Sequence, residues 1–146
     1  MADVVSKMGQ GRSVGRSAAD RLLAAIGYPE RMPNTDEPFT LRVDGKEMLV
    51  EESAGRIVLS HVLTEDDSLL PTLAVYAAGR MLREEATLAH GRTSAFLWQD
   101  APANADDHAL VRLFETFADS CDWWRARVDE RENGNSVEMS EAVIRP

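Results

Sequence analysis

The fold is decided by residues 39–63, FTLRVDGKEMLVEESAGRIVLSHVL. At its start, apolar residues alternate with polar ones, which is typical of a strand with one face on a core. The dipeptide Asp44-Gly45 suits a two-residue hairpin turn, because both residue types tolerate a positive φ, and Ser53-Ala54-Gly55 offers a second tight turn. The stretch therefore predicts an antiparallel meander of three strands, over 39–43, 46–52 and 56–63.

Helical signals lie on both sides of this meander. Ser17 and Asp20 have the spacing of a capping box, with Asp in place of Glu, and Gly27 is a stop signal after the apolar residues that follow. From Leu70 onward apolar residues recur at i, i+3, i+4, i+7, i+11 and i+12, which predicts a second helix over 69–86. A continuous apolar stripe from Leu110 to Val128 predicts the third helix.

Two more strands are expected between the second and third helices, a short one at 86–90 and a longer one at 93–99. The order becomes α-β-β-β-α-β-β-α, an α+β fold with three helices on a twisted antiparallel sheet. We expect one domain over 17–131. Residues 1–16 and 132–146 lack helical or strand periodicity, so we expect a flexible N-terminal arm and a flexible C-terminal tail.

Charge and cysteine usage exclude several classes of partner. The 146 residues include 25 acidic and 16 basic side chains, a formal charge of -9, which repels a phosphate backbone and an anionic membrane. We therefore expect no nucleic acid partner and no membrane insertion. The only cysteine, Cys121, cannot form an internal disulfide, and the first twenty residues lack the apolar run of a secretory signal. A cytoplasmic location is expected.

The sequence carries none of the common catalytic, nucleotide-binding or metal-binding motifs. His61, His90 and His108 have no ligand spacing among them, and the acidic pairs lie where solvated residues are expected. Cys121 falls on the apolar stripe of the last helix, as a core residue would. We predict that the protein is not an enzyme and that it needs no cofactor and no metal.

Several strands have apolar residues on both faces. In 56–63, Ile57 and Leu59 point opposite to Val58 and Val62, and the same holds within 47–51 and 93–99. Three helices can cover one face of a five-stranded sheet, so the second face requires a second copy or a bound polypeptide. The alternative is that these are ordinary exposed apolar residues.

The two adjacent tryptophans of the last helix cannot both enter the core. Trp123 and Trp124 lie about 100° apart around a helix, so one of them is expected at the edge of the core. That tryptophan is either an ordinary residue of the core edge or an anchor at an interface. Tyr76, Arg80 and Arg83 similarly fall off the apolar stripe of the middle helix. They are either solvated residues or contacts across a dimer interface.

Five stretches in this order and spacing resemble the class I type III secretion chaperones, the Tir-chaperone (CesT and SycE-like) family. They are FTLRVDGKEMLVEES, GRIVLSHVL, LPTLAVYAAGRMLREEATLA, SAFLWQDAP and ALVRLFETFADSCDWWRARV. The resemblance covers about residues 17–128 and rests on pattern, size and acidity rather than on a diagnostic motif. Within the family, the chain is most similar to the chaperones of plant-associated bacteria that serve several effectors.

The resemblance implies a bacterial cytoplasmic chaperone that binds the N-terminal region of effectors in extended form and keeps them stable and secretion-competent. It also implies a homodimer built through the middle helix and a neighbouring strand. The implied dimer residues are Tyr76, Arg80, Arg83, Phe96 and Trp98. The implied effector-binding residues are Leu22, Leu23, Ile26, Phe39, Leu41, Met48 and Val50, some of which must be core residues.

A second hypothesis is a dimeric adaptor or regulatory domain of the same fold. Such a domain would bind a folded component of the secretion system, such as the secretion ATPase. A third, a small-molecule enzyme or ligand binder, would need a closed pocket with convergent polar groups, and the sequence offers no residues for it.

Overall fold

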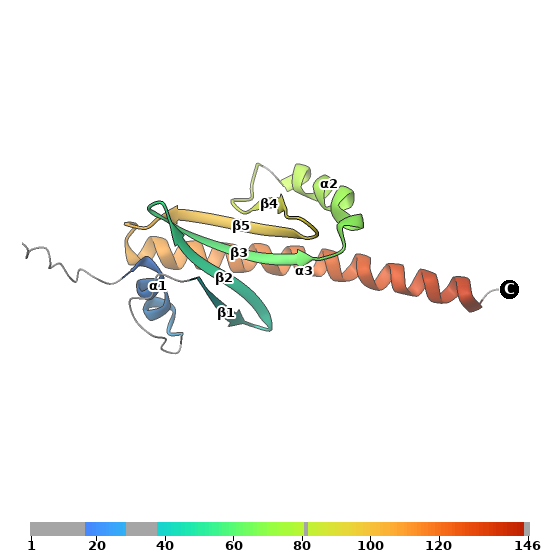
Figure 1. The fold of residues 1–146 in the computed structure, drawn as a ribbon, viewed down its shortest axis with the longest axis horizontal. Coiled ribbons are helices and arrows are strands. Elements are labelled where there is room, and N and C mark those ends of the chain that lie inside the picture. Colours follow the sequence, from blue (N-terminus) through green and yellow to red (C-terminus); the bar gives the residue numbers. More distant parts are fainter. Residues whose placement is uncertain (1–16, 29–37, 81, 145–146) are drawn as a thin grey trace, which may run out of the picture. The chain divides into compact units, whose positions relative to one another are not determined.

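The computed structural model describes residues 17–28, 38–80 and 82–144. Its elements, drawn in Figure 1, are α1 (Ala18–Ile26), β1 (Phe39–Val43), β2 (Lys46–Ser53), β3 (Arg56–Thr64), a 3-10 turn (Asp67–Leu69), α2 (Leu70–Arg80), β4 (Thr87–His90), β5 (Ala95–Pro102) and α3 (Asp107–Ile144). The strands form one five-stranded antiparallel sheet in the order β1-β2-β3-β5-β4. The predicted fold class and element order are confirmed.

The two tight turns of the meander have the geometry that their residues suggested. Asp44 and Gly45 have φ values of 51° and 80°, and β1 and β2 pair from Phe39↔Val50 to Val43↔Lys46. Ala54 and Gly55 also have positive φ, 54° and 78°. Paired positive φ values match the right-handed twist of the flanking strands, so both turns keep neighbouring strands in register.

Helix α1 begins and ends where its capping residues predicted. The Ser17 hydroxyl accepts a hydrogen bond from the Asp20 amide at 3.1 Å. Gly27 adopts the left-handed conformation, φ 76°, and the amide of Tyr28 then bonds back to the Leu23 carbonyl at 3.0 Å. This is the usual way in which glycine ends a helix, because it has no Cβ to clash in that conformation.

The other two helices differ in length from their predictions. Helix α2 ends at Arg80 rather than at residue 86, and the amides of Arg83 and Glu84 both bond to the Arg80 carbonyl. Helix α3 continues to Ile144, so residues 132–144 are helical where we predicted a tail. The prediction relied on apolar periodicity, which stops at Val128, and residues 133–136, Asn-Gly-Asn-Ser, are weak helix formers, so helix propensity gave no signal for this extension either.

The described residues group into two compact units. The first contains residues up to 59 and 99–115, and the second contains 60–98 and 116 onward. The core of the first includes Leu22, Leu41, Met48, Val50, Ile57, Leu59 and Leu110, all fully buried. The core of the second includes Leu73, Leu97, Phe117, Cys121, Trp124 and Val128, also buried. The prediction of one domain over 17–131 stays a prediction.

Candidate functional site

In the first unit, α1 packs on β2 and brings together the residues implied to bind effectors. Most of them belong to the interior. Leu22, Leu23, Leu41, Met48 and Val50 are at most 5% exposed, whereas Ile26 and Phe39 are half-buried. In this structure only Ile26 and Phe39, of the seven, offer apolar surface to a partner.

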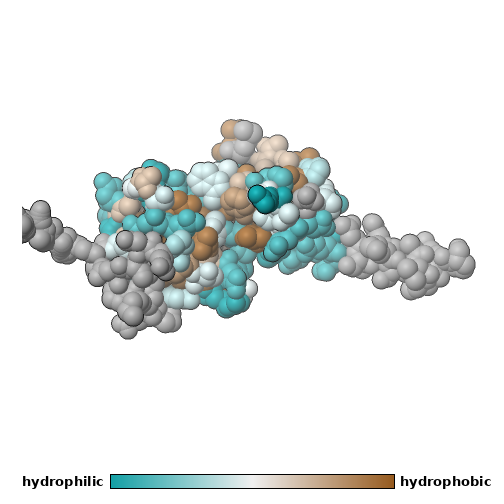
Figure 2. Space-filling model, viewed as in Figure 1, coloured by the Kyte–Doolittle hydropathy of each residue, from teal (hydrophilic) through white to brown (hydrophobic). Residues whose placement is uncertain are grey.

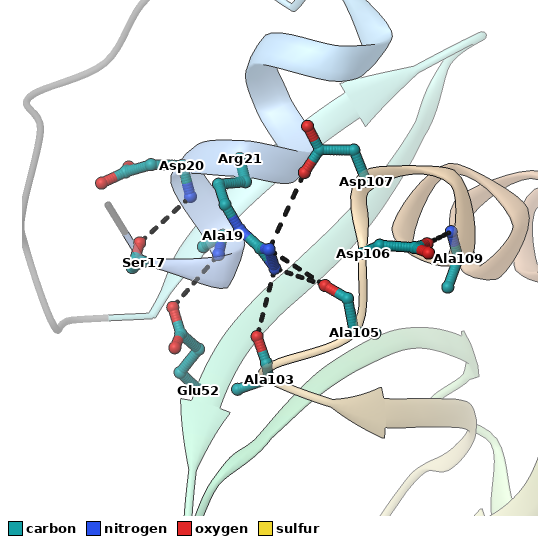
Figure 3. A network of polar contacts seen from close by, with 10 residues as sticks. All are labelled: Ser17, Ala19, Asp20, Arg21, Glu52, Ala103, Ala105, Asp106, Asp107 and Ala109. Atoms are coloured by element: carbon teal, nitrogen blue, oxygen red, sulfur yellow. Dashed lines mark hydrogen bonds and ion pairs between the residues drawn. The ribbon is translucent and has the colours of Figure 1, made fainter. Parts of the chain in front are cut away.

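A polar network fixes α1 in the first unit (Figure 3). The Ala19 amide donates to the Glu52 carboxylate at 3.1 Å. The Arg21 guanidinium donates to the carbonyls of Ala103, at 3.2 Å, and Ala105, at 2.6 and 2.9 Å, and lies 3.7 Å from the Asp107 carboxylate. Arg21 therefore ties α1 to the loop that leads into α3. Ile26 lies at the C-terminal end of a helix whose N-terminal end is fixed by these bonds.

The edge of the sheet next to α1 carries a feature that the sequence did not suggest. Strand β1 is the first strand of the sheet, so within the described part of the chain one of its sides has no neighbouring strand. The Arg42 amide donates to the Tyr28 hydroxyl at 3.3 Å, just after α1 ends. Tyr28 thus occupies one edge position at which an added strand would place a carbonyl oxygen.

In the second unit, β5 has apolar residues on both faces, as predicted. Ala95 and Leu97 are buried, while Phe96 and Trp98 point to the other face and are half-buried. Their partners across the pair with β4 are Ala89 and Thr87. Val62 of β3 is 50% exposed.

Helix α2 exposes more apolar surface than its pattern predicted. Leu73 is its only buried residue among those the structure describes, Val75 is 70% exposed, and Leu82, just past the helix, is 97% exposed. Figure 2 shows apolar side chains gathered over the area where Figure 1 places α2. The apolar periodicity had placed Leu82 on the buried stripe, which is wrong because the helix ends at Arg80.

The implied dimer residues divide into two groups. Tyr76 and Arg80 face α3 of the same chain, where the Tyr76 ring lies 6.1 Å from that of Trp123 and the Arg80 guanidinium lies 3.8 Å from the same indole. Arg83 is exposed, and Phe96 and Trp98 offer part of their surface. Of the two tryptophans, Trp124 is buried and Trp123 is half-buried, which confirms that one lies at the edge of the core.

A buried carboxylate holds the end of α2 to α3. Glu84, with a side chain 5% exposed, accepts hydrogen bonds from Arg80 at 2.6 Å, from the Trp124 indole at 3.0 Å and from the Ser120 hydroxyl. Burial by itself raises the pKa of the Glu84 carboxyl. The hydrogen bonds from Arg80, Ser120 and Trp124 outweigh burial, so its pKa lies below the ordinary value.

A pocket of about 380 Å³ lies beside this carboxylate. It is lined by Ala74, Ala77, Glu84, Ala86, Thr87, Leu88 and Trp124. Its space comes from the small side chains of α2 and of the segment leading into β4. Among the described residues that line it, Glu84 is the only carboxylate, and it already has three donors. Within the described ranges, no three His, Cys, Asp or Glu side chains are grouped closely enough to hold a metal ion. In the same part of the chain, no helix is both long and apolar enough to cross a membrane.

No model of a protein family matches the sequence, and no curated protein matches it. Solved structures do. A chain of the HopA1–SchA chaperone–effector complex matches with a TM-score of 0.59 at 14% identity, covering 73% of this chain and 89% of that one. A chain of the ExsC–ExsE complex matches with a TM-score of 0.58 at 14% identity, covering 86% and 96%.

A third match is a chain of the heterodimeric ExoU–SpcU complex from the type III secretion system of Pseudomonas aeruginosa. Its TM-score is 0.55 at 21% identity, and the match covers 74% of this chain and 91% of that one. At such identities the likeness shows the fold alone. The fold is that of type III secretion chaperones.

Proposed function

We propose that this chain, which has the fold of class I type III secretion chaperones, binds the N-terminal region of effector proteins in the bacterial cytoplasm and performs no catalysis. The observation that carries the proposal is the likeness to chains of complexes described as chaperone–effector and type III secretion complexes. The apolar surface left open on the chain supports it, because contiguous exposed apolar surface marks a site of protein association.

The client site is proposed on α1 and the β1–β2 hairpin. Ile26 and Phe39 supply apolar contact there, and the buried leucines behind them shape the surface. The outer edge of β1, which no strand of the described residues covers, supplies backbone hydrogen bonds to a segment in extended form. This mode of recognition tolerates many sequences. Such a segment would displace the Tyr28 hydroxyl from the Arg42 amide.

The second apolar surface is proposed to be covered by another copy of the chain. Val75, Leu82, Phe96 and Trp98 all belong to the second unit and keep apolar area exposed. Tyr76 and Arg80 already have partners on α3, so we place the centre of the interface on Val75 and Leu82 instead.

The client site is tested by co-expression with the N-terminal region of a candidate type III effector, followed by affinity purification of the effector segment. We expect the chaperone to co-purify, and the Ile26→Asp variant to be retained at less than a tenth of the wild-type amount. The matched control is Ala25→Asp, at an exposed position of the same helix. If both variants were retained equally, α1 would not be part of the client site. Recovery of folded secretion components with no effector would instead support the adaptor function.

The dimer is tested by light scattering on the purified chain. We expect the mass of two 16.1 kDa chains for the wild type and of one chain for Leu82→Glu and Trp98→Glu. Because Leu82 is 97% exposed in the single chain, Leu82→Glu leaves the fold of the monomer intact. Thr93→Glu, in the exposed turn before β5, serves as the control. A dimer that survives both apolar substitutions would place the interface elsewhere.

A further inference from the structure

A pocket and a protruding leucine lie close together at the end of α2 in the second unit. The pocket has a volume of about 380 Å³. Its walls include the small or apolar residues Ala74, Ala77, Ala86 and Leu88. Leu82 lies two residues before Glu84, which is also part of the wall, and is 97% exposed. Because two residues span at most about 7 Å, Leu82 stands beside the pocket without entering it.

The pocket suits an apolar side chain that comes from another molecule. Ala74 is exposed and Leu88 is half-buried, so the pocket opens to the surface. An apolar cavity of about 150 Å³ can hold a benzene molecule, so this pocket has room for a leucine side chain. Water finds few hydrogen-bond partners there, because the Glu84 carboxylate already has three donors. An apolar side chain that displaces this water is therefore favoured.

Helix α2 carries little charge, as is usual for the centre of a protein interface. Val75, next to Ala74 in the pocket wall, is 70% exposed, and Figure 2 shows apolar side chains gathered over α2. Arg80 is the only charged residue of α2, and its guanidinium is bonded to Glu84 at 2.6 Å. At Gly79, an added Cβ would meet nothing within 4 Å, so among the described residues nothing covers this side of the helix.

We infer that Leu82 of one copy of the chain occupies this pocket in a second copy, and that the second copy returns the same contact. In an interface with two-fold symmetry every contact is made twice, and assembly stops at two chains. A partner of another sequence could fill the pocket but would need its own recess for Leu82, whereas a second copy already has one. The inference rests on the dimer of the proposed function and specifies the contact at its centre.

The test removes the leucine in one variant and fills the pocket in another. Leu82→Ala leaves the pocket without an occupant, and Ala74→Phe places a ring at its mouth. Both positions are exposed in the single chain, so both variants are expected to keep its fold, which far-UV circular dichroism checks. Sedimentation equilibrium of the full chain then gives the dimer dissociation constant. We expect each variant to weaken the dimer about a hundredfold, which is about tenfold for each of the two contacts.

Ala126→Phe is the matched control, because Ala126 is an exposed position of α3 in the same unit. It adds the same ring away from the pocket and is expected to leave the dimer unchanged. If Ala74→Phe does not fold, Leu82→Ala decides the question alone.

A mixture of the two variants separates this contact from a general loss of packing. The Leu82→Ala chain keeps an open pocket and the Ala74→Phe chain keeps its leucine, so a mixed dimer regains one of the two contacts. In the other contact a filled pocket faces a shortened side chain, which leaves room for the ring. With a fluorophore on one of the chains, we expect the mixed dimer to be about tenfold tighter than the dimer of either variant.

The outcomes separate this inference from the proposed function. A wild-type dimer whose dissociation constant is unchanged by Leu82→Ala would overturn the inference and leave the proposed dimer in place, and a mixed dimer no tighter than the two variants would also overturn it. A wild type that is monomeric at every concentration would refute the inference and the dimer together, while effector retention is measured separately. If Ala74→Phe abolished effector retention and left the dimer intact, the pocket would belong to the client and the inference would be wrong.

Discussion

Replacement of Glu84 tests the packing of the second unit most directly. Glu84→Ala removes the acceptor of the Arg80 guanidinium, the Ser120 hydroxyl and the Trp124 indole at once. Loss of one partner of a buried ion pair typically costs about 3–5 kcal/mol. The Arg80 side chain is 23% exposed and can regain water, so we expect the lower end, about 3 kcal/mol of the free energy of unfolding.

The measurement is equilibrium unfolding in urea, followed by far-UV circular dichroism and by tryptophan fluorescence. Glu84→Gln keeps one acceptor oxygen without the charge and is expected to lose about 1–2 kcal/mol. Glu65→Ala, at an exposed position, is the control and is expected to stay within about 0.5 kcal/mol of the wild type. If Glu84→Ala and Glu65→Ala lost the same free energy, the network would contribute nothing to stability and our reading of it would be wrong.

Three further predictions follow from the described contacts. The pKa of Glu84 is lowered in the folded state, so the ionised carboxylate stabilises the fold at neutral pH, and this stabilisation is lost as the pH falls below the ordinary value of 4.5. The difference in free energy of unfolding between the wild type and Glu84→Gln should therefore shrink between pH 6 and pH 3. Arg21→Ala removes the bonds to the carbonyls of Ala103 and Ala105 and should lower the free energy of unfolding by about 1–2 kcal/mol in urea titrations, whereas no change would mean that α1 is held by apolar contact alone. Leu41→Ala empties a fully buried position and should cost about 2–4 kcal/mol by thermal unfolding, and a loss below 1 kcal/mol would indicate an open groove position instead of a core position.

The parts of the fold that depend on neighbours in sequence could be predicted well. Asp44-Gly45 specifies its turn because only certain residues adopt positive φ easily, and the turn then sets the register of β1 and β2. Ser17 and Gly27 mark the ends of α1 for equally local reasons. The alternation in β5 predicted two apolar faces, because side chains in a strand point to opposite sides whatever lies beyond them.

The candidate site could be predicted only in part, because burial depends on packing between distant segments. Periodicity identified Leu22, Leu41 and Met48 as apolar positions, but only the packing of α1 on the hairpin made them core residues. Leu82 shows the opposite error, since the pattern continued past the end of α2 while the helix did not.

The sequence by itself determined the order of the elements, their turns and caps, and the excess of apolar surface. The tertiary structure decided which apolar residues are left exposed and which polar groups meet. Ser120 and Trp124 are 36 and 40 residues from Glu84 along the chain, so no local pattern relates them. The contacts of Tyr76 and Arg80 with Trp123 likewise exist only because α2 and α3 lie together. Contacts between remote segments follow from the packing of the whole unit rather than from the residues on either side.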